Sequence, residues 1–156
     1  METTQKKLMV LSKIAKKLNE NNITWAIGAS MLLYFKDITN KFNDIDIVVA
    51  EDDVESLNEI VLTFGDILPP NPNLKYRTRH FLEFKVDGVD IDVMAGFIIV
   101  KKNQEYYFPL QHGDINDYTE INGVKIPLQS ISEWRKYYEL MGRTEKVEMI
   151  DSKLYN

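Results

Sequence analysis

Two aspartates that share one face of a predicted strand are the residues best suited to chemistry. They lie in the run Asn43-Asp44-Ile45-Asp46-Ile47-Val48-Val49, where they alternate with β-branched residues. In a strand, side chains at positions i and i+2 point to one face, so Asp44 and Asp46 project together. Neighbouring carboxylates at the end of a buried strand repel each other and lose hydration. A divalent cation offsets both costs, and Mg²⁺ is usually held by one or two carboxylates plus substrate phosphates.

A second acidic strand repeats this alternation in Gly88-Val89-Asp90-Ile91-Asp92-Val93-Met94. It follows a strand pattern over residues 76–86 and the dipeptide Asp87-Gly88, which is a signal for a two-residue hairpin turn. Asp90 and Asp92 share one face by alternation, and on spacing alone either could supply a third carboxylate to the metal.

A glycine-containing turn precedes both acidic strands. The apolar run 23–27 stops at Gly28-Ala29-Ser30, and residues 31–35 continue as apolar residues suited to a buried helix. The N–H groups of such a turn, together with the positive end of the following helix, attract phosphate groups. Acidic positions on adjacent strands that face this turn predict a triphosphate site, with metal ions bridging the phosphates to the aspartates.

The order of these features resembles the nucleotidyltransferase superfamily that shares the DNA polymerase β catalytic core. That order is a hydrophobic strand, G-x-S, a helix, D-h-D-h and a later h-[DE]-h strand, where h is hydrophobic. The sequence looks most like the small stand-alone members, the minimal nucleotidyltransferases. The resemblance continues through Gly123-Val124-Lys125-Ile126-Pro127-Leu128, a helix, and Gly142-Arg143-Thr144-Glu145-Lys146. It implies an α/β (α+β) fold with a mixed β-sheet flanked by helices.

The resemblance also implies a reaction, in which a nucleoside monophosphate moves from an NTP to an acceptor hydroxyl and pyrophosphate is released. Asp44 and Asp46 would hold two Mg²⁺ ions, for which Mn²⁺ is an alternative. The third catalytic and metal-binding carboxylate is expected at Asp92, with Asp90 as a near neighbour. The residues expected to cradle the phosphates are Gly28, Ala29 and Ser30.

Basic residues near these motifs are candidates for accessory contacts. In related enzymes the loop that corresponds to residues 36–43 borders the nucleotide pocket, so Lys41 is expected to contact nucleotide, with Lys36 as a further candidate. An ordinary surface loop is the alternative. His80 could assist proton transfer, and Arg79 could bind the outgoing pyrophosphate or the acceptor. The alternatives are a packing role for His80 and an edge-strand position for Arg79.

Length and composition bound the class of protein. The chain of 156 residues predicts one domain, with a catalytic core over about 1–100 and a C-terminal hairpin and two helices over about 118–156. The sequence has no cysteine, no signal-peptide pattern and no transmembrane pattern, which favours the cytoplasm. A net charge of −5 weighs against a broad nucleic-acid-binding surface, which normally needs a basic face.

The remaining patterns predict the elements that must hold these residues. A helix is expected over residues 3–19, and a second helix is expected to start at 51–53, where acidic residues favour the first turn. The proline-rich segment 69–73 predicts a loop, and residues 97–100 predict a strand. Segment 103–119 is expected to be irregular and aromatic. Asn122-Gly123 predicts a hairpin turn, and from Ser130 onward two helices are expected, broken at Gly142.

Two other interpretations remain open from the sequence. The first is a non-catalytic nucleotide-binding or partner-binding domain of the toxin–antitoxin type, but that subgroup tends to carry arginines just after the turn, and residues 31–35 contain none. The second is a structural cation site, which leaves the turn at 28–30 unexplained. The acceptor is not identified by any residue. Part of its site could come from a second subunit of a homodimer, with segment 103–119 as the place to look.

Overall fold

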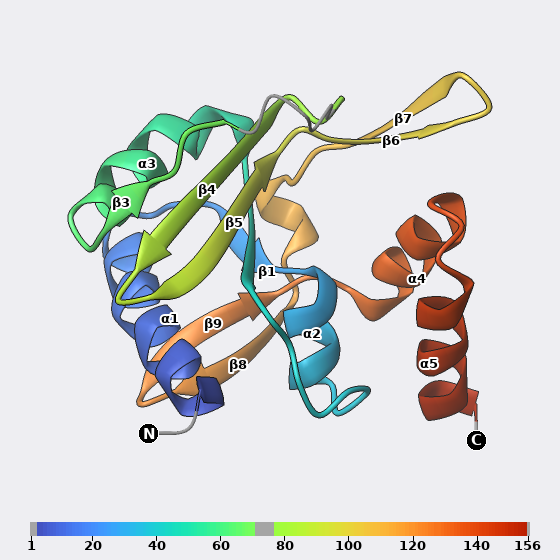
Figure 1. The fold of residues 1–156 in the computed structure, drawn as a ribbon, viewed down its shortest axis with the longest axis horizontal. Helices are drawn as coiled ribbons and strands as arrows, with labels where there is room; N and C mark the ends of the chain where they lie inside the picture. Colours follow the sequence, from blue (N-terminus) through green and yellow to red (C-terminus); the bar gives the residue numbers. More distant parts are fainter. Residues whose placement is uncertain (1–2, 71–76, 156) are drawn as a thin grey trace.

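The computed structural model describes residues 3–70 and 77–155, and its centre is a seven-stranded sheet flanked by helices (Figure 1). Strands β2 and β5 are parallel, as are β1 and β9, whereas the other neighbouring pairs are antiparallel. The sheet is therefore mixed, and the predicted fold class is confirmed. Its strands, in spatial order, are β3 (Asp66–Ile67), β4 (His80–Val86), β5 (Val89–Ala95), β2 (Ile45–Val49), β1 (Trp25–Ile27), β9 (Val124–Leu128) and β8 (Asp117–Ile121).

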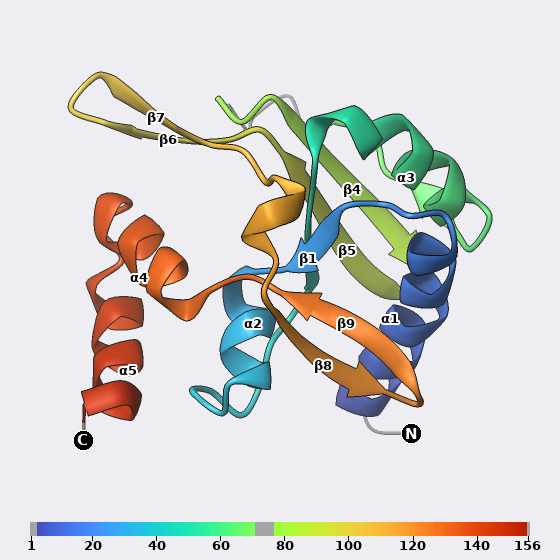
Figure 2. The same ribbon diagram turned by 180° about the vertical axis from the view of Figure 1, so that it is seen from behind.

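The helices lie around this sheet, with α1 packed against α3 and with α4 and α5 beside each other near the C-terminus (Figure 2). The predicted first helix, the acidic helix start and the C-terminal pair with its break are confirmed. Gly142 adopts a positive φ of 75° at that break. No helix within the described ranges is both long and apolar enough to cross a membrane. The helices are α1 (Thr3–Glu20), α2 (Ala29–Phe35), η1 (Glu51–Asp53), α3 (Val54–Leu62), η2 (His112–Asp114), α4 (Ile131–Leu140) and α5 (Thr144–Tyr155).

Alternation along β5 separates the core from the site. Val89, Ile91 and Val93 are buried, and the β4–β5 register places Ile91 opposite the fully buried Phe84. The residues between them, including Asp92, point to the opposite face of the sheet. Burial of the apolar set therefore fixes which face presents the carboxylates, because a shift of one residue would reverse it.

Three hairpin turns share one backbone geometry, with positive φ at both central residues. Asp87-Gly88 and Asn122-Gly123 confirm the two turns that the sequence predicts. The third turn, Lys102-Asn103, has φ values of 51° and 63° and joins β6 (Phe97–Lys101) to β7 (Gln104–Phe108). The prediction of an irregular segment over 103–119 is therefore wrong. Without a glycine, the Lys102-Asn103 pair lacks the usual sequence signal for such a turn.

Strand β4 begins at His80, later than the predicted start at Tyr76, which lies outside the described residues, as do residues 71–73 of the predicted loop. Just before the strand, the Thr78 hydroxyl accepts a hydrogen bond of 3.1 Å from the Ile98 amide. The Thr78 side chain thus satisfies the Ile98 N–H, which the backbone of a neighbouring strand would satisfy if the strand pairing continued.

Candidate active site

Strand register brings the predicted carboxylates together. Asp46 on β2 and Asp92 on β5 are direct partners in the parallel pairing of these strands. Asp44, just before β2, forms a side-chain hydrogen bond with Asp92. On the other side of β5, Glu83 of β4 is the direct partner of Asp92. The result is a row of acidic positions, Asp46, Asp92 and Glu83, across three adjacent strands, with Asp44 beside it.

Burial and mutual repulsion raise the pKa values of these carboxyl groups. Burial raises the pKa of Asp46 well above its usual value, and the charges of Asp92 and Asp44 add to that effect. Burial also raises the pKa of Asp92 to about 7, with further contributions from Asp44 and Glu83. The pKa of Asp44 is raised by burial and by Asp90. At neutral pH this cluster therefore has a strong tendency to retain a proton or to bind a cation.

The three aspartates line a cavity of about 520 Å³ together with residues of the turn and of the C-terminal helices. Lys146 of α5 lies with its Nζ 3.5 Å from the Ser30 Oγ, and its charge also acts on Asp46. Arg143, between α4 and α5, lines the same cavity. Acidic groups from the sheet and basic groups from the helices therefore share one space. The apolar part of its lining includes Phe81, Met94, Phe97 and Met141.

The turn has an unusual conformation at Ala29 rather than at Gly28. Ala29 has a φ of 53°, in the left-handed region that side chains disfavour, whereas Gly28 has a φ of −130°. Gly28 is required for a different reason, because a Cβ there would lie 2.5 Å from the Gln129 Oε1 and 2.8 Å from the Trp134 ring. Helix α2 has only seven residues. Within its first turn, the amide of Met31 donates to the Asp46 carboxylate.

The other predicted site residues lie outside this cavity lining. Lys41 is exposed in the loop before β2. Asp90 is exposed and forms an ion pair of 3.3 Å with Lys85. His80 is exposed at the first position of β4.

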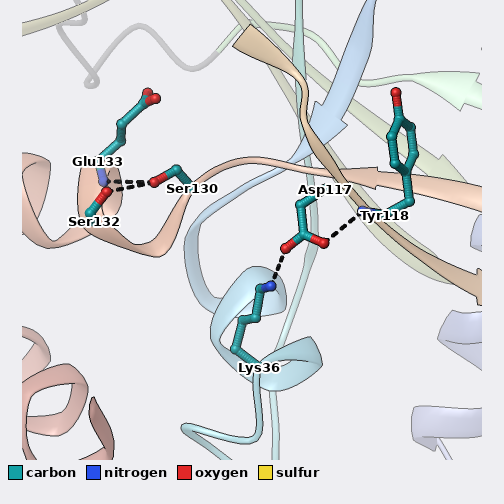
Figure 3. Close-up of polar contacts among 6 residues, drawn as sticks. All are labelled: Lys36, Asp117, Tyr118, Ser130, Ser132 and Glu133. Carbon is teal, nitrogen blue, oxygen red and sulfur yellow. Dashed lines mark hydrogen bonds and ion pairs between the residues drawn. The ribbon is translucent and has the colours of Figure 1, made fainter. Parts of the chain in front are cut away.

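Two of the predicted basic contacts have partners elsewhere on the surface. The Arg79 guanidinium lies 3.1 Å from a Glu51 oxygen and over the ring of Tyr107, so it holds the base of the β6–β7 hairpin. The Lys36 ammonium pairs with Asp117 on β8 (Figure 3). This pair ties the end of α2 to an edge strand.

Sequence reasoning missed several residues that the fold brings to the site. Glu83 could have been found, because counting outward from the Asp87-Gly88 turn pairs it with Asp92. Tyr138 lines the cavity and interacts with the Ser30 hydroxyl, and burial raises the pKa of Tyr138 to about 12. Trp134 lies four residues earlier on α4, against Gly28. No local pattern distinguishes these aromatic residues from ordinary core positions.

The donor atoms suit a hard divalent cation. Carboxylate oxygens are the protein ligands of Mg²⁺. Burial and repulsion between neighbouring carboxylates raise the pKa values of Asp46 and Asp92, and a bound cation would offset both effects. Within residues 3–70 and 77–155, no three acidic or histidine side chains converge closely enough to form a complete ion site by themselves. Mg²⁺ ordinarily keeps several waters and takes further oxygens from substrate phosphates.

Comparison with known proteins gives matches at the level of structure only. No protein-family model matches the sequence, and no curated protein matches it significantly. A protein of Thermotoga maritima, provisionally assigned as a nucleotidyltransferase, superposes with a TM-score of 0.71 at 22% identity, over 99% of this chain and 95% of that one.

Two antibiotic-modifying enzymes have the same architecture. ANT(2")-Ia, in complex with adenylyl-2"-tobramycin, superposes with a TM-score of 0.63 at 17% identity, over 97% of this chain and 90% of that one. The lincosamide antibiotic adenylyltransferase LnuA, with lincomycin bound, superposes with a TM-score of 0.59 at 14% identity, over 91% of this chain and 94% of that one. The chain therefore has the nucleotidyltransferase fold.

Proposed function

We propose that this chain is a metal-dependent nucleotidyltransferase, which transfers a nucleoside monophosphate from an NTP to an acceptor hydroxyl and releases pyrophosphate. The observation that carries the proposal is one cavity lined by Asp44, Asp46 and Asp92 together with Ser30 and Lys146. A structural cation site would need the carboxylates alone. The hydroxyl and the ammonium group beside them suit phosphate oxygens.

The carboxylates would hold the metal ions. Asp44 and Asp46 would bind two Mg²⁺ ions, or Mn²⁺ in their place, with Asp92 contributing to the ion nearer the acceptor. When bound, these ions neutralise phosphate charge and polarise the reacting oxygens. Asp46 is fixed for this role by its place in β2 and by the Met31 amide.

Groups from the turn and the C-terminal helices would hold the triphosphate. The Ser30 hydroxyl and the Lys146 ammonium, 3.5 Å apart, can both donate to phosphate oxygens. Arg143 can add a planar guanidinium from the same cavity. Because α2 is short, this binding rests on the side chains and the turn more than on a helix dipole.

Asp92 would accept the proton of the acceptor hydroxyl. In the chain without metal, the pKa of Asp92 is about 7. A bound Mg²⁺ would lower this pKa and favour the carboxylate form, which can accept a proton. The acceptor would approach over the β5 and β4 side, where Phe81 and Met94 border the cavity. The two antibiotic-modifying neighbours make a small-molecule hydroxyl the first acceptor class to examine.

Isothermal titration of ATP, GTP, CTP and UTP, with and without Mg²⁺, tests the proposal. We expect Mg²⁺-dependent binding of at least one nucleotide by the unmodified chain and loss of that binding in an Asp44→Asn/Asp46→Asn variant. Circular dichroism of the variant establishes that it is folded. The absence of binding at millimolar nucleotide, or equal binding by the variant, would contradict the proposal and favour a non-catalytic partner-binding domain.

A further inference from the structure

We propose that Gln129 and Trp134 are positioning residues for nucleotide binding, because their buried hydrogen bond fixes the backbone of the turn at 28–30. The inference rests on the proposed function and extends it to residues outside the sequence motifs. It assigns to helix α4 the task of holding the turn in its binding conformation before the nucleotide arrives.

Two side chains, those of Gln129 and Trp134, pack closely against Gly28. The Trp134 Nε1 donates to the Gln129 Oε1 at 2.7 Å, and this hydrogen bond is buried. Both groups lie so near Gly28 that a single added carbon would overlap them, at 2.5 Å from the amide oxygen and 2.8 Å from the ring. The hydrogen-bonded pair therefore forms a rigid wall against the turn.

The other side of Gly28 is fixed by the strand that carries the catalytic carboxylates. The Gly28 amide donates to the Asp46 carbonyl at 3.1 Å, and the Gln129 amide donates to the Ile27 carbonyl at 3.0 Å. Gly28 is thus held between the backbone of β2 and the Gln129 side chain. Movement of Gln129 would move the turn relative to Asp46.

Helix α4 contacts the turn at both ends. Trp134 lies against Gly28, and Tyr138, one helical turn later, interacts with the Ser30 hydroxyl. The Trp134 ring is itself held by Phe97, with ring centroids 5.7 Å apart, and by Tyr137 at 5.1 Å. Between these contacts, Ala29 keeps its disfavoured φ of 53°. A strained residue persists only where its surroundings determine its conformation. The contacts of α4 on both sides of Ala29 restrain it in this way.

A pair of matched substitutions separates this role from simple stability. Trp134→Phe removes the indole N–H at the turn. Trp25→Phe removes the other indole N–H, which donates to the Oδ1 of Asn19 on α1 at 3.0 Å. Both variants lose one hydrogen bond and the same number of atoms. Comparison of their melting temperatures shows whether the two substitutions destabilise the fold equally.

Two readouts are compared between these variants. The first is amide hydrogen exchange of Gly28 and Leu32 in the nucleotide-free protein. The Gly28 N–H donates to the Asp46 carbonyl, and the Leu32 N–H donates to the Gly28 carbonyl. The second is calorimetric affinity for Mg²⁺–ATP. Trp134→Phe is expected to speed exchange at both amides and to weaken ATP binding, each by about tenfold, as for one lost buried hydrogen bond. Trp25→Phe is expected to change neither.

The outcomes distinguish this inference from the proposed function. Equal exchange and equal ATP affinity in the two variants would overturn the positioning role. A wild-type chain that binds no nucleotide would contradict the proposed function, while exchange at Gly28 would still decide whether Trp134 fixes the turn. If Trp134→Phe does not fold, Gln129→Leu removes the acceptor of the same hydrogen bond and carries the same two expectations.

Discussion

The carboxylates of the sheet and those of the C-terminal helices have opposite electrostatic surroundings. Asp151 on α5 accepts two hydrogen bonds from Arg135 on α4, at 2.6 and 2.9 Å, and this guanidinium lowers the pKa of Asp151. Asp46 and Asp92 instead lie side by side on paired strands, where burial and repulsion raise their pKa values.

This contrast indicates which carboxylates serve the scaffold. Arg135 neutralises Asp151 within the chain, so the pair joins α4 to α5 without needing any other molecule. The aspartates of the sheet keep a free-energy cost that a bound cation and phosphate would remove. Strongly perturbed carboxylates in a cavity are typical of functional sites, because a site that was fully satisfied by the chain would have no affinity left for a ligand.

The largest effect is expected from Asp46→Asn. The substitution keeps the shape of the side chain but removes the charge of one proposed metal ligand. We expect Mg²⁺–ATP affinity to fall by roughly 100-fold, which corresponds to about 3 kcal/mol for a charged interaction. Calorimetric titration measures it. Unchanged affinity would show that the carboxylate row is not the metal site.

Asp92→Asn is expected to stabilise the metal-free chain at high pH. The pKa of Asp92 is 3.8 unfolded and about 7 folded, so the folded state binds the proton more tightly. Its contribution to stability is fully present below about pH 4 and is lost as the pH rises through 7. The amide does not titrate, so at pH 8 we expect the variant to be more stable by about 1–2 kcal/mol, after allowance for solvent screening.

Urea unfolding with EDTA at pH 5 and pH 8 measures this difference. The free energy of unfolding of the variant should exceed that of the unmodified chain by more at pH 8 than at pH 5. A larger difference at pH 5 would mean that the pKa of Asp92 is lowered, not raised, in the folded chain.

A smaller effect, on stability alone, is expected from Asp151→Asn. The substitution weakens the partly buried pair with Arg135, so the melting temperature should fall by a few degrees at most. Because Asp151 does not line the cavity, Mg²⁺–ATP affinity should stay the same. A loss of affinity comparable to that of Asp46→Asn would remove the distinction between the two sets of carboxylates.

The smallest expected effect belongs to Glu83→Gln. Glu83 is the strand partner of Asp92, and its charge is one of the causes of the raised pKa. Its removal should lower the pKa of Asp92 below its present value of about 7. A carbon-13 NMR titration of the aspartate carboxyl groups measures the change. An unaltered pKa of Asp92 would show that burial, Asp44 and Asp90 account for the raised value without Glu83.

The sequence was informative where short-range patterns decide the structure. Alternation in 43–49 and 88–94 placed the aspartates on strand faces, and Asp87-Gly88 and Asn122-Gly123 predicted hairpin turns, which the fold confirms. These features depend on neighbours within a few residues. The fold class was implied by the family resemblance of these motifs, and the catalytic and binding roles of the residues stay predictions.

Long-range packing decides what the sequence did not provide. Spacing alone left Asp90 and Asp92 equivalent, and only the resemblance favoured Asp92. The pairing of Asp92 with Asp46 depends on the parallel register of β2 and β5, which no hairpin sets. Lys146 reaches Ser30 across 116 positions of the chain, and Trp134 reaches Gly28 through the docking of α4. The left-handed conformation of Ala29 has no sequence signal, because alanine ordinarily avoids it.

Electron paramagnetic resonance of Mn²⁺ tests the central claim most directly. Mn²⁺ is titrated into the chain with a non-hydrolysable ATP analogue present, and free and bound ions are counted for the unmodified protein and for Asp46→Asn. We expect two nucleotide-dependent Mn²⁺ ions per chain, the number in two-metal sites, and their loss in the variant. Equal Mn²⁺ binding by both proteins, or Mn²⁺ binding that does not depend on the nucleotide, would contradict the proposed metal site.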